Sequence, residues 1–226
     1  MSKEQSAIDI ADLSYHVFDY SALAMQTLCM VNNPRKVLIA GLGAGIIPRS
    51  ISLLYPEAEI EVVEIDPKML KIAKEYFHFE TKDKLRVYTG DAYSVFNELP
   101  KYQYDIVVLD AFMSGYIPHH LMTTQFFKIV SERLSNKSVV AVNVCNGHPS
   151  YFSQIKTIIS AMPEDELFSS KGVRNPYTTM LYVLRGGFRY QALPEIALPK
   201  VDPIIPLPVE ITDDIINAQI FQLPSV

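Results

Sequence analysis

The chain has 226 residues, of which 49% are hydrophobic and 20% charged, a composition that allows one sizeable folded core. Its 25 acidic residues outnumber its 20 basic residues, and the formal net charge of -5 gives no global electrostatic case for a nucleic acid or an anionic membrane as partner. The N-terminal residues contain no apolar leader, and no stretch approaches the roughly 20 apolar residues of a membrane span, so we expect a cytoplasmic protein.

Strands alternate with helices along most of the chain. A packed helix is predicted over residues 20–31, where the ring of Pro34 helps to end it. Five strands are then predicted over residues 37–40, 59–64, 85–89, 104–109 and 138–144. Helices are expected over residues 46–55, from residue 67 onward, and over residues 91–99, 118–134 and 150–161. Two further strands, over residues 167–170 and 179–185, are expected to form an antiparallel hairpin.

This alternation is typical of an α/β protein with a doubly wound, Rossmann-like sheet. We expect seven strands, mostly parallel, with the antiparallel hairpin at one edge. We divide the chain into three segments: a short N-terminal segment and helix over residues 1–34, a Rossmann-like domain over 35–190, and a proline-rich tail over 191–226. The tail, with a short helix candidate at 212–218, is expected to lie extended on the domain or to be partly disordered.

A glycine-rich loop follows the first strand, with glycines at Gly41, Gly43 and Gly45. Glycines at a strand-to-helix turn let backbone amides approach a ligand, and the next helix presents its free N–H groups. The spacing is GxGxG, and Ile46 stands where a dinucleotide fingerprint has its third glycine, which lowers the case for NAD. The alternative is that the glycines only permit a tight turn.

Three acidic residues lie at or just after the ends of the second, third and fourth strands, where parallel sheets bind ligands. Glu64 lies about 20 residues after the loop, which suits an acid that binds the two hydroxyls of a ribose. Asp91 could accept a hydrogen bond from an adenine amino group or cap the following helix. Asp110 could contact a ligand or substrate amine, or be a buried carboxylate held by loop amides. Asp66, beside a proline, is interpreted as a helix cap.

The remaining reactive side chains give weaker signals. Cys29 and Cys145 form no CxxC or Cys/His cluster, so neither a disulfide framework nor a zinc site is predicted. His119 and His120 are adjacent in a helical region, and neighbouring helical residues point in different directions and do not easily hold one metal. We therefore expect two free thiols, no metal, and two non-catalytic histidines.

Together these motifs resemble the class I adenosylmethionine-dependent transferase fold and, within it, the spermidine synthase-like (polyamine aminopropyltransferase) family. The resemblance runs from about residue 20 to residue 185. It is carried by residues 37–45, 62–67, 90–92, 104–112 and 117–127. The last of these, Ile-Pro-His-His-Leu-Met-Thr-Thr-Gln-Phe-Phe, looks especially like this branch of the fold.

The resemblance implies a site for adenosylmethionine or decarboxylated adenosylmethionine. The residues implied to bind it are Gly41, Leu42, Gly43, Ala44, Gly45, Glu64, Ile65, Asp91, Ala92 and Asp110. Glu64 would hold the ribose, Asp91 and Ala92 would contact adenine, and Asp110 would lie beside the sulfonium and act in catalysis. The family's chemistry is attack by a substrate amine on a carbon attached to positive sulfur. The implied partner is a small amine or another nucleophile, and a homodimer is one expected assembly.

Two acidic residues of the family are replaced. Aminopropyltransferases carry Gly-Gly-Gly-Asp-Gly at the first loop, where this chain has Ala44, and an aspartate as catalytic acid/base at the position of Met113. A polyamine product therefore does not follow from the resemblance. A methyltransferase is the close alternative, although Ala40 stands where many methyltransferases carry an acid. A non-catalytic ligand-binding protein of the same fold is the third reading.

Overall fold

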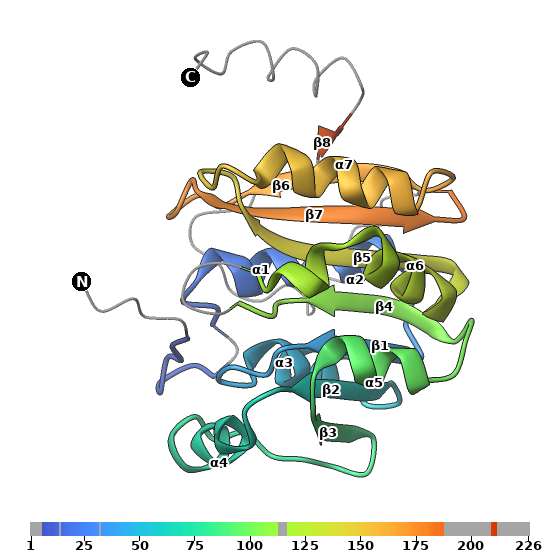
Figure 1. Ribbon diagram of the computed structural model, residues 1–226. Helices are drawn as coiled ribbons and strands as arrows, with labels where there is room; N and C mark the ends of the chain where they lie inside the picture. Colours follow the sequence, from blue (N-terminus) through green and yellow to red (C-terminus); the bar gives the residue numbers. More distant parts are fainter. Residues whose placement is uncertain (1–5, 14, 32, 113–116, 188–208, 212–226) are drawn as a thin grey trace.

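The computed structural model describes residues 6–13, 15–31, 33–112, 117–187 and 209–211 (Figure 1). The strands are β1 (Lys36–Ala40), β2 (Glu59–Glu64), β3 (Leu85–Thr89), β4 (Tyr104–Leu109), β5 (Leu134–Cys145), β6 (Glu166–Lys171), β7 (Thr178–Arg185) and β8 (Val209–Glu210). The helices are α1 (Asp19–Met25), α2 (Thr27–Met30), α3 (Ile46–Leu54), α4 (Pro67–Tyr76), α5 (Ala92–Glu98), the 3-10 helix η1 (His119–Met122), α6 (Thr124–Arg133) and α7 (Tyr151–Ala161).

The strands form one sheet in the order β3-β2-β1-β4-β5-β7-β6-β8. Strands β1 to β5 pair in parallel, whereas β7 runs antiparallel to β5 and β6, and β8 runs antiparallel to β6. The predicted α/β sheet, mostly parallel with an antiparallel edge, is therefore confirmed. The eighth strand was not predicted, because its two residues are too few to show any alternation.

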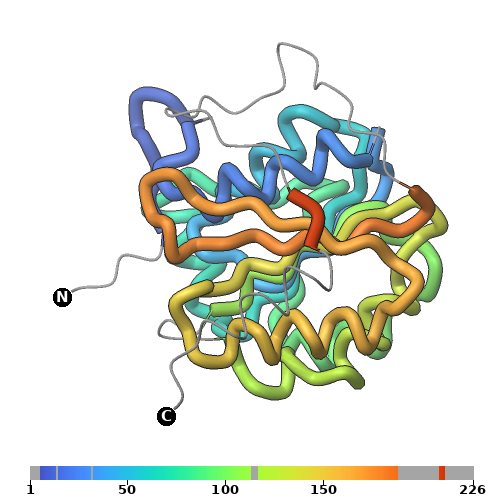
Figure 2. Tube along the Cα trace, turned by 90° about the horizontal axis from the view of Figure 1, so that it is seen from above, coloured from blue at the N-terminus to red at the C-terminus, as the bar shows by residue number. Residues whose placement is uncertain are grey.

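Helices cover both faces of the sheet, as Figure 2 shows with the chain seen from above. Helices α1 to α4 pack on one face and α5 to α7 on the other. Within β1, Val37 and Ile39 pack into the core on the α1-to-α4 face, whereas Leu38 and Ala40 pack into the core on the α5-to-α7 face. This is the period-two alternation of a strand. This burial on both sides explains why the central strands are apolar throughout.

Three element boundaries differ from the predictions. The helical region expected over residues 118–134 is divided at Thr123, which is extended and whose hydroxyl accepts a hydrogen bond from the Phe126 amide as the N-cap of α6. The first helix is divided into α1 and α2 at Gln26. Strand β5 begins at Leu134, which pairs with Tyr104 across a register shift. The predicted helix at 212–218 lies outside the described residues, and the division at residues 34 and 190 stays a prediction.

Candidate functional site

The candidate site lies where β1 and β4 end side by side. These strands are neighbours in the sheet although β2 and β3 separate them in the chain, which makes this the topological switch point. The Asp110 amide donates to the Ala40 carbonyl over 2.8 Å, and the Gly41 amide donates to the Val63 carbonyl over 2.8 Å. The loop after β1 is thereby fixed to the end of β2, and the loop after β4 is fixed to the end of β1, at the carboxyl edge of the sheet.

A cavity of about 1050 Å³ opens at this edge. Of the predicted site residues, its walls contain Gly41, Gly43, Ala44, Glu64, Ile65, Asp91, Ala92 and Asp110. The other two predicted residues do not line it. The Leu42 side chain is buried in the core on the α1-to-α4 face, and Gly45 is the N-cap of α3. The volume suits a ligand of nucleoside size with an additional chain.

The loop after β1 requires glycine at its first and last positions. Gly41 has φ +98°, and a Cβ there would lie 2.3 Å from the Asp110 carbonyl oxygen. Gly45 has φ +75°, and a Cβ there would lie 2.3 Å from the Phe79 ring. Since a positive φ and a tight contact coincide at both positions, a side chain is excluded by strain and by space. The loop therefore passes directly over Asp110, and α3 begins against the ring of Phe79.

Glu64 ties the glycine loop to the loop after β2. One carboxylate oxygen accepts from the Leu42 amide over 2.8 Å and the other from the Asp66 amide over 2.9 Å. The side chain is buried except for 8% of the residue surface, which faces the cavity. Each carboxylate oxygen has a second lone pair, so the group can still accept hydrogen bonds from ligand hydroxyls. Asp66 caps α4 through the Lys68 amide, as predicted.

Asp91 caps a helix, which is one of the two roles that the sequence left open, and it also contacts a histidine. One oxygen caps α5 by accepting from the Ser94 amide over 3.2 Å. The other lies 2.7 Å from Nε2 of His120, and both residues line the cavity. The sequence predicted neither this contact nor a place for His120 at the site, because 29 residues separate the pair. Their partial exposure to water makes the pair a weak stabiliser and leaves both side chains accessible to a ligand.

Asp110 has the most perturbed carboxyl group of the site. Burial raises its pKa to about 7; a hydrogen bond from Asn143 opposes the rise, and the nearby Glu64 carboxylate adds to it. The Asn143 amide donates to Asp110 over 2.8 Å. A carboxyl group with a pKa near neutrality can take or release a proton under ordinary conditions. Asn143 was not predicted, and the one available signal was a polar residue within the apolar run of β5.

The N-terminal segment contributes to the same cavity. Ser6, Val17 and Phe18 line it, although the sequence showed little pattern there. The Ser6 hydroxyl accepts from the Ala44 amide over 3.3 Å and lies 3.3 Å from the Tyr20 hydroxyl. Burial raises the pKa of Tyr20 well above its ordinary value, and the charge of Asp110 adds to this, so the phenol stays protonated. Tyr20 therefore supplies a hydroxyl donor near Asp110.

A buried histidine anchors this N-terminal segment to α3. The His16 side chain is fully buried, and its Nε2 lies 3.1 Å from the Ser50 hydroxyl. Burial and, to a smaller extent, the neighbouring Arg49 charge together lower the pKa of His16 to about 4. The Arg49 guanidinium in turn donates to the Leu13 carbonyl over 3.0 Å. The segment is therefore held in place by a neutral histidine and a cationic arginine.

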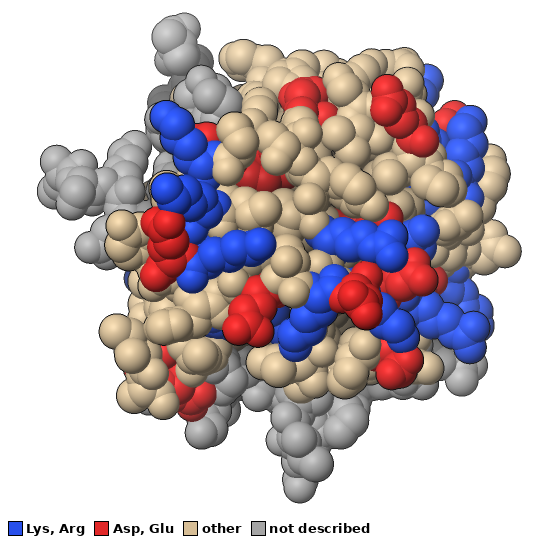
Figure 3. All heavy atoms as spheres, turned by 90° about the horizontal axis from the view of Figure 1, so that it is seen from below, with Lys and Arg blue, Asp and Glu red and all other residues tan. Residues whose placement is uncertain are grey.

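Charges elsewhere do not gather into a patch of one sign on the face drawn in Figure 3. Lysine and arginine side chains alternate there with acidic ones. Among the described residues, Lys84 pairs with Glu57 and Lys71 pairs with Glu75. Among the described residues no group of three or more His, Cys, Asp or Glu side chains is arranged to hold a metal ion. Within that same part of the chain, no helix is long and apolar enough to cross a membrane.

Comparison with solved structures identifies the class of fold. Human methyltransferase-like protein 13 in complex with SAH has a TM-score of 0.61 and 23% identity, over 80% of this chain and 82% of that chain. A spermidine synthase in complex with the transition state analogue AdoDATO has a TM-score of 0.59 and 18% identity, over 76% of this chain and 60% of that chain. The fold is thus the Rossmann-like fold shared by these methyltransferases and spermidine synthases.

Sequence comparison identifies the family within that class. Residues 17–169 match the model of the spermine/spermidine synthase domain, and the chain belongs to this family. A polyamine aminopropyltransferase of Vibrio vulnificus is 37% identical over 149 residues, which are 65% of this chain and 50% of that protein. The chain therefore aligns with only half the length of this relative. The family resemblance inferred from the glycine loop and the strand-end acids is confirmed.

Proposed function

We propose that the protein is a spermidine synthase-like transferase that binds adenosylmethionine or decarboxylated adenosylmethionine and alkylates an amine or another small nucleophile. The observation that carries the proposal is that three carboxylates from separate strand ends and the glycine loop line one cavity. Both related structures described above contain an adenosyl ligand or analogue. The cavity and its polar walls fit such a group.

We call the part of the large cavity that is lined by the glycine loop, Glu64, Ile65, Asp91 and Ala92 the donor half. It supplies a partner for each part of an adenosyl group. Glu64 accepts hydrogen bonds from the ribose hydroxyls, while its bonds to the Leu42 and Asp66 amides keep the carboxylate in place. Asp91 and Ala92 border the adenine, and Ile65 packs against one face of the ring. Ile65 is 55% exposed in the described chain, so covering it with an aromatic ring removes apolar surface from water.

Asp110 is proposed to take the proton of the attacking nucleophile. The bound sulfonium supplies an electrophilic carbon, and an amine attacks it only as the free base. With a pKa of about 7, the Asp110 carboxylate is available at neutral pH to accept a proton from the amine. Asn143 holds one carboxylate oxygen over 2.8 Å and so orients the other.

The polyamine product is not part of the proposal. Ala44 is buried and apolar where the family carries an aspartate, so the loop offers no side-chain carboxylate for a donor's amine. Met113, at the position of the second family acid, lies outside the described residues. Methyl transfer is the second candidate, favoured by this missing loop acid and by the likeness to a methyltransferase solved with SAH.

The test is to incubate the protein with each donor and a broad amine panel and to identify the nucleoside product by mass spectrometry. Methylthioadenosine reports aminopropyl transfer, and adenosylhomocysteine reports methyl transfer. We expect saturable binding of at least one of these two nucleosides, together with turnover of the matching donor. Binding without turnover supports a ligand-binding protein, and absence of binding contradicts the adenosyl site itself.

A further inference from the structure

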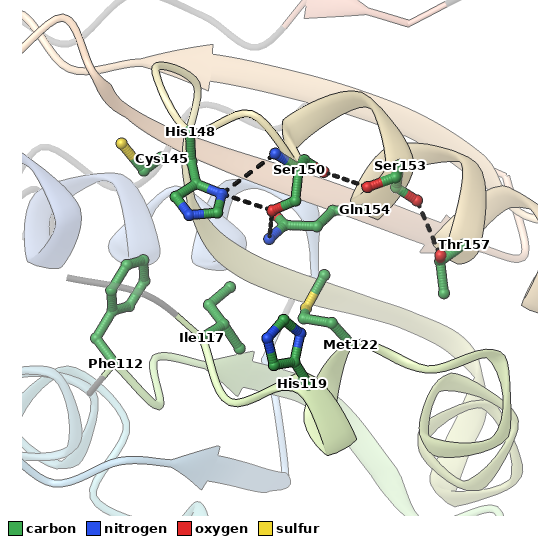
Figure 4. Close-up of a pocket in the computed structure, with 10 residues that line it drawn as sticks. All are labelled: Phe112, Ile117, His119, Met122, Cys145, His148, Ser150, Ser153, Gln154 and Thr157. Carbon is green, nitrogen blue, oxygen red and sulfur yellow. Dashed lines mark hydrogen bonds between the residues drawn. The ribbon is translucent and has the colours of Figure 1, made fainter. Parts of the chain in front are cut away.

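A second cavity, of about 180 Å³, adjoins the large one (Figure 4). The two share Phe112 and Cys145 in their walls. The small cavity is bordered by η1 and by the first turns of α7, and its remaining lining residues are Ile117, His119, Met122, His148, Ser150, Ser153, Gln154 and Thr157. It is therefore an extension of the site: η1 borders both cavities, whereas α7 borders the small one and contributes no residue to the walls of the large one.

The position of the shared residues places this extension next to Asp110. Phe112 comes two positions after Asp110, and Cys145 comes two positions after Asn143 on β5. Since alternate residues of a strand lie on the same face, Asn143 and Cys145 face the same side of the sheet. A molecule whose reacting atom lies beside the Asp110–Asn143 pair can therefore extend past Cys145 into the small cavity.

The described lining of the small cavity contains no Asp, Glu, Lys or Arg. A second ammonium, as in a polyamine, would enter this cavity without a carboxylate to pair with. Since His119, His148 and Ser153 are exposed, a second ammonium would stay partly hydrated in this cavity, but it would gain no charge-assisted hydrogen bond from the lining.

Hydrogen bonds connect three polar residues of the small cavity, His148, Ser150 and Gln154, and one polar atom of Gln154 has no partner among the described residues. Nδ1 of His148 accepts from the Ser150 amide over 3.2 Å and lies 2.7 Å from the Ser150 hydroxyl, so that hydroxyl donates to it and Nε2 carries the ring proton. The Gln154 amide nitrogen donates to the same hydroxyl over 2.9 Å. The Gln154 carbonyl oxygen is buried and has no hydrogen-bond partner among the described residues. Figure 4 shows these three side chains together at the start of α7.

The network fixes the orientation of the Gln154 amide. Ser150 donates its one hydroxyl proton to Nδ1 of His148, so the group that faces the Ser150 oxygen must be the Gln154 amide nitrogen, and the unused atom is the Gln154 carbonyl oxygen. The cavity thus offers the His148 Nε2–H as a donor and one uncharged amide atom. An uncharged polar group that both donates and accepts hydrogen bonds matches these atoms best.

We infer that the small cavity is the subsite for the non-reacting end of the acceptor, and that it selects an uncharged hydroxyl or carboxamide over an ammonium or a carboxylate. This inference rests on the proposed function, because it assigns the acceptor of the same reaction. Gln154 is the residue that sets the preference, and Ser150 positions its amide.

The test uses four amines with the same reacting end and the same four-carbon chain: putrescine, 4-aminobutanol, 4-aminobutanamide and 4-aminobutyrate. Their affinities are measured by calorimetry with the full chain saturated with methylthioadenosine. We expect the hydroxyl and carboxamide compounds to bind about 10-fold more tightly than the other two. Equal or tighter binding of putrescine overturns the inference.

A pair of variants tests whether Gln154 causes the preference. Gln154→Glu adds a carboxylate of nearly the same shape and should shift the preference to putrescine by about 10-fold. The control is Gln125→Glu, which makes the same change on the exposed surface of α6, outside both cavities, and should leave the order unaltered. An unchanged order in Gln154→Glu contradicts the inference.

Methylthioadenosine binding separates failure of this inference from failure of the proposed function. If the wild-type protein does not bind the nucleoside, the proposed donor site is wrong, and the subsite inference falls with it. If the nucleoside binds normally and none of the four amines binds, the donor site stands and the acceptor subsite is wrong.

Discussion

The proposed donor half of the site contains the glycine loop, Glu64 and Asp91, and the proposed acceptor half contains Asp110, Asn143 and the small cavity. The two halves are built in different ways. In the donor half, Glu64 is held by backbone amides, and Asp91 also caps the helix that follows it. In the acceptor half, Asp110 contacts Asn143, and Gln154 contacts Ser150, through side chains alone. The backbone of the donor half therefore depends on its acids, whereas acceptor residues can change identity without disturbing the fold.

Replacing Asp110 tests the reacting end of the acceptor half and should give the largest effect. Asp110→Asn removes the proton acceptor at nearly constant shape, and we expect the rate of alkyl transfer to fall about 1000-fold. Binding of the donor nucleoside should change by less than about 3-fold, because Glu64 and Asp91 are untouched. Rates at saturating donor and a direct titration measure the two quantities. An equal loss in both would mean that Asp110 acts mainly in binding.

The pH dependence of the wild-type rate gives a second view of Asp110. Its carboxylate forms as the pH rises through about 7, so the rate should rise over this range. Asn143→Leu removes the hydrogen bond that lowers the pKa of Asp110, so the midpoint of the pH–rate profile should move to higher pH. A midpoint that is the same in Asn143→Leu and the wild type contradicts the assignment.

Gly41 joins the two halves, because it belongs to the loop after β1 and lies against the Asp110 carbonyl. A Cβ at Gly41 would lie 2.3 Å from that oxygen, and the φ of +98° at this position is one that residues with a side chain rarely adopt. We expect Gly41→Ala to lower the free energy of unfolding by about 3 kcal/mol or more in a denaturant titration. Gly187→Ala is the matched control, since its φ is +78° with no atom within 4 Å, and should cost only about 1 kcal/mol. Equal losses would show that contact with Asp110 is unimportant.

Glu64 tests the donor half. Glu64→Ala removes the proposed ribose contacts and the partner of two loop amides, and we expect the dissociation constant for methylthioadenosine to rise about 100-fold, or about 2.7 kcal/mol. Glu59→Ala is the control, because Glu59 is an exposed glutamate at the other end of β2. Calorimetry measures both variants. Unchanged affinity in Glu64→Ala would remove Glu64 from the donor site.

The acid dependence of stability tests whether buried His16 anchors the N-terminal segment, which lines the large cavity. Its pKa is lowered to about 4 in the folded protein and is about 6.5 when the chain unfolds, so only the unfolded state gains a proton between these values. The stability due to the neutral histidine is therefore present above pH 6.5 and is lost as the pH falls toward 4. Between pH 7 and pH 5 this loss should be about 2 kcal/mol.

The control for this effect is His16→Gln, which cannot titrate. Denaturant titrations at pH 7 and pH 5 should show a smaller loss of stability in the variant than in the wild type. The same loss in both proteins would mean that other groups cause the acid dependence.

The difference between the two halves also explains what the sequence could predict. Glu64 is the last residue of β2, Asp91 comes two positions after β3, and Asp110 directly follows β4. Strand ends located from apolar runs were therefore sufficient to find them. The class of sheet, mostly parallel with an antiparallel edge, follows from the same runs and from their alternation with helices. Local patterns carry no comparable signal for side chains that meet across the fold.

Contacts between distant segments were therefore missed. His120 meets Asp91, and Ser6 meets the Ala44 amide, only because the fold brings their segments together. The small cavity depends on Gln154, which lies on a helix that the sequence predicted without assigning it any site residue. Pairing of this kind is decided by tertiary structure, and a single sequence contains no spacing that reports it.

The most direct test of the central claim is a crystal structure of the protein with methylthioadenosine bound. The account predicts the nucleoside in the large cavity, with its ribose hydroxyls within hydrogen-bond distance of Glu64, its adenine beside Asp91, and its sulfur next to Asp110. A nucleoside bound elsewhere, or turned so that its ribose does not contact Glu64, would contradict the account.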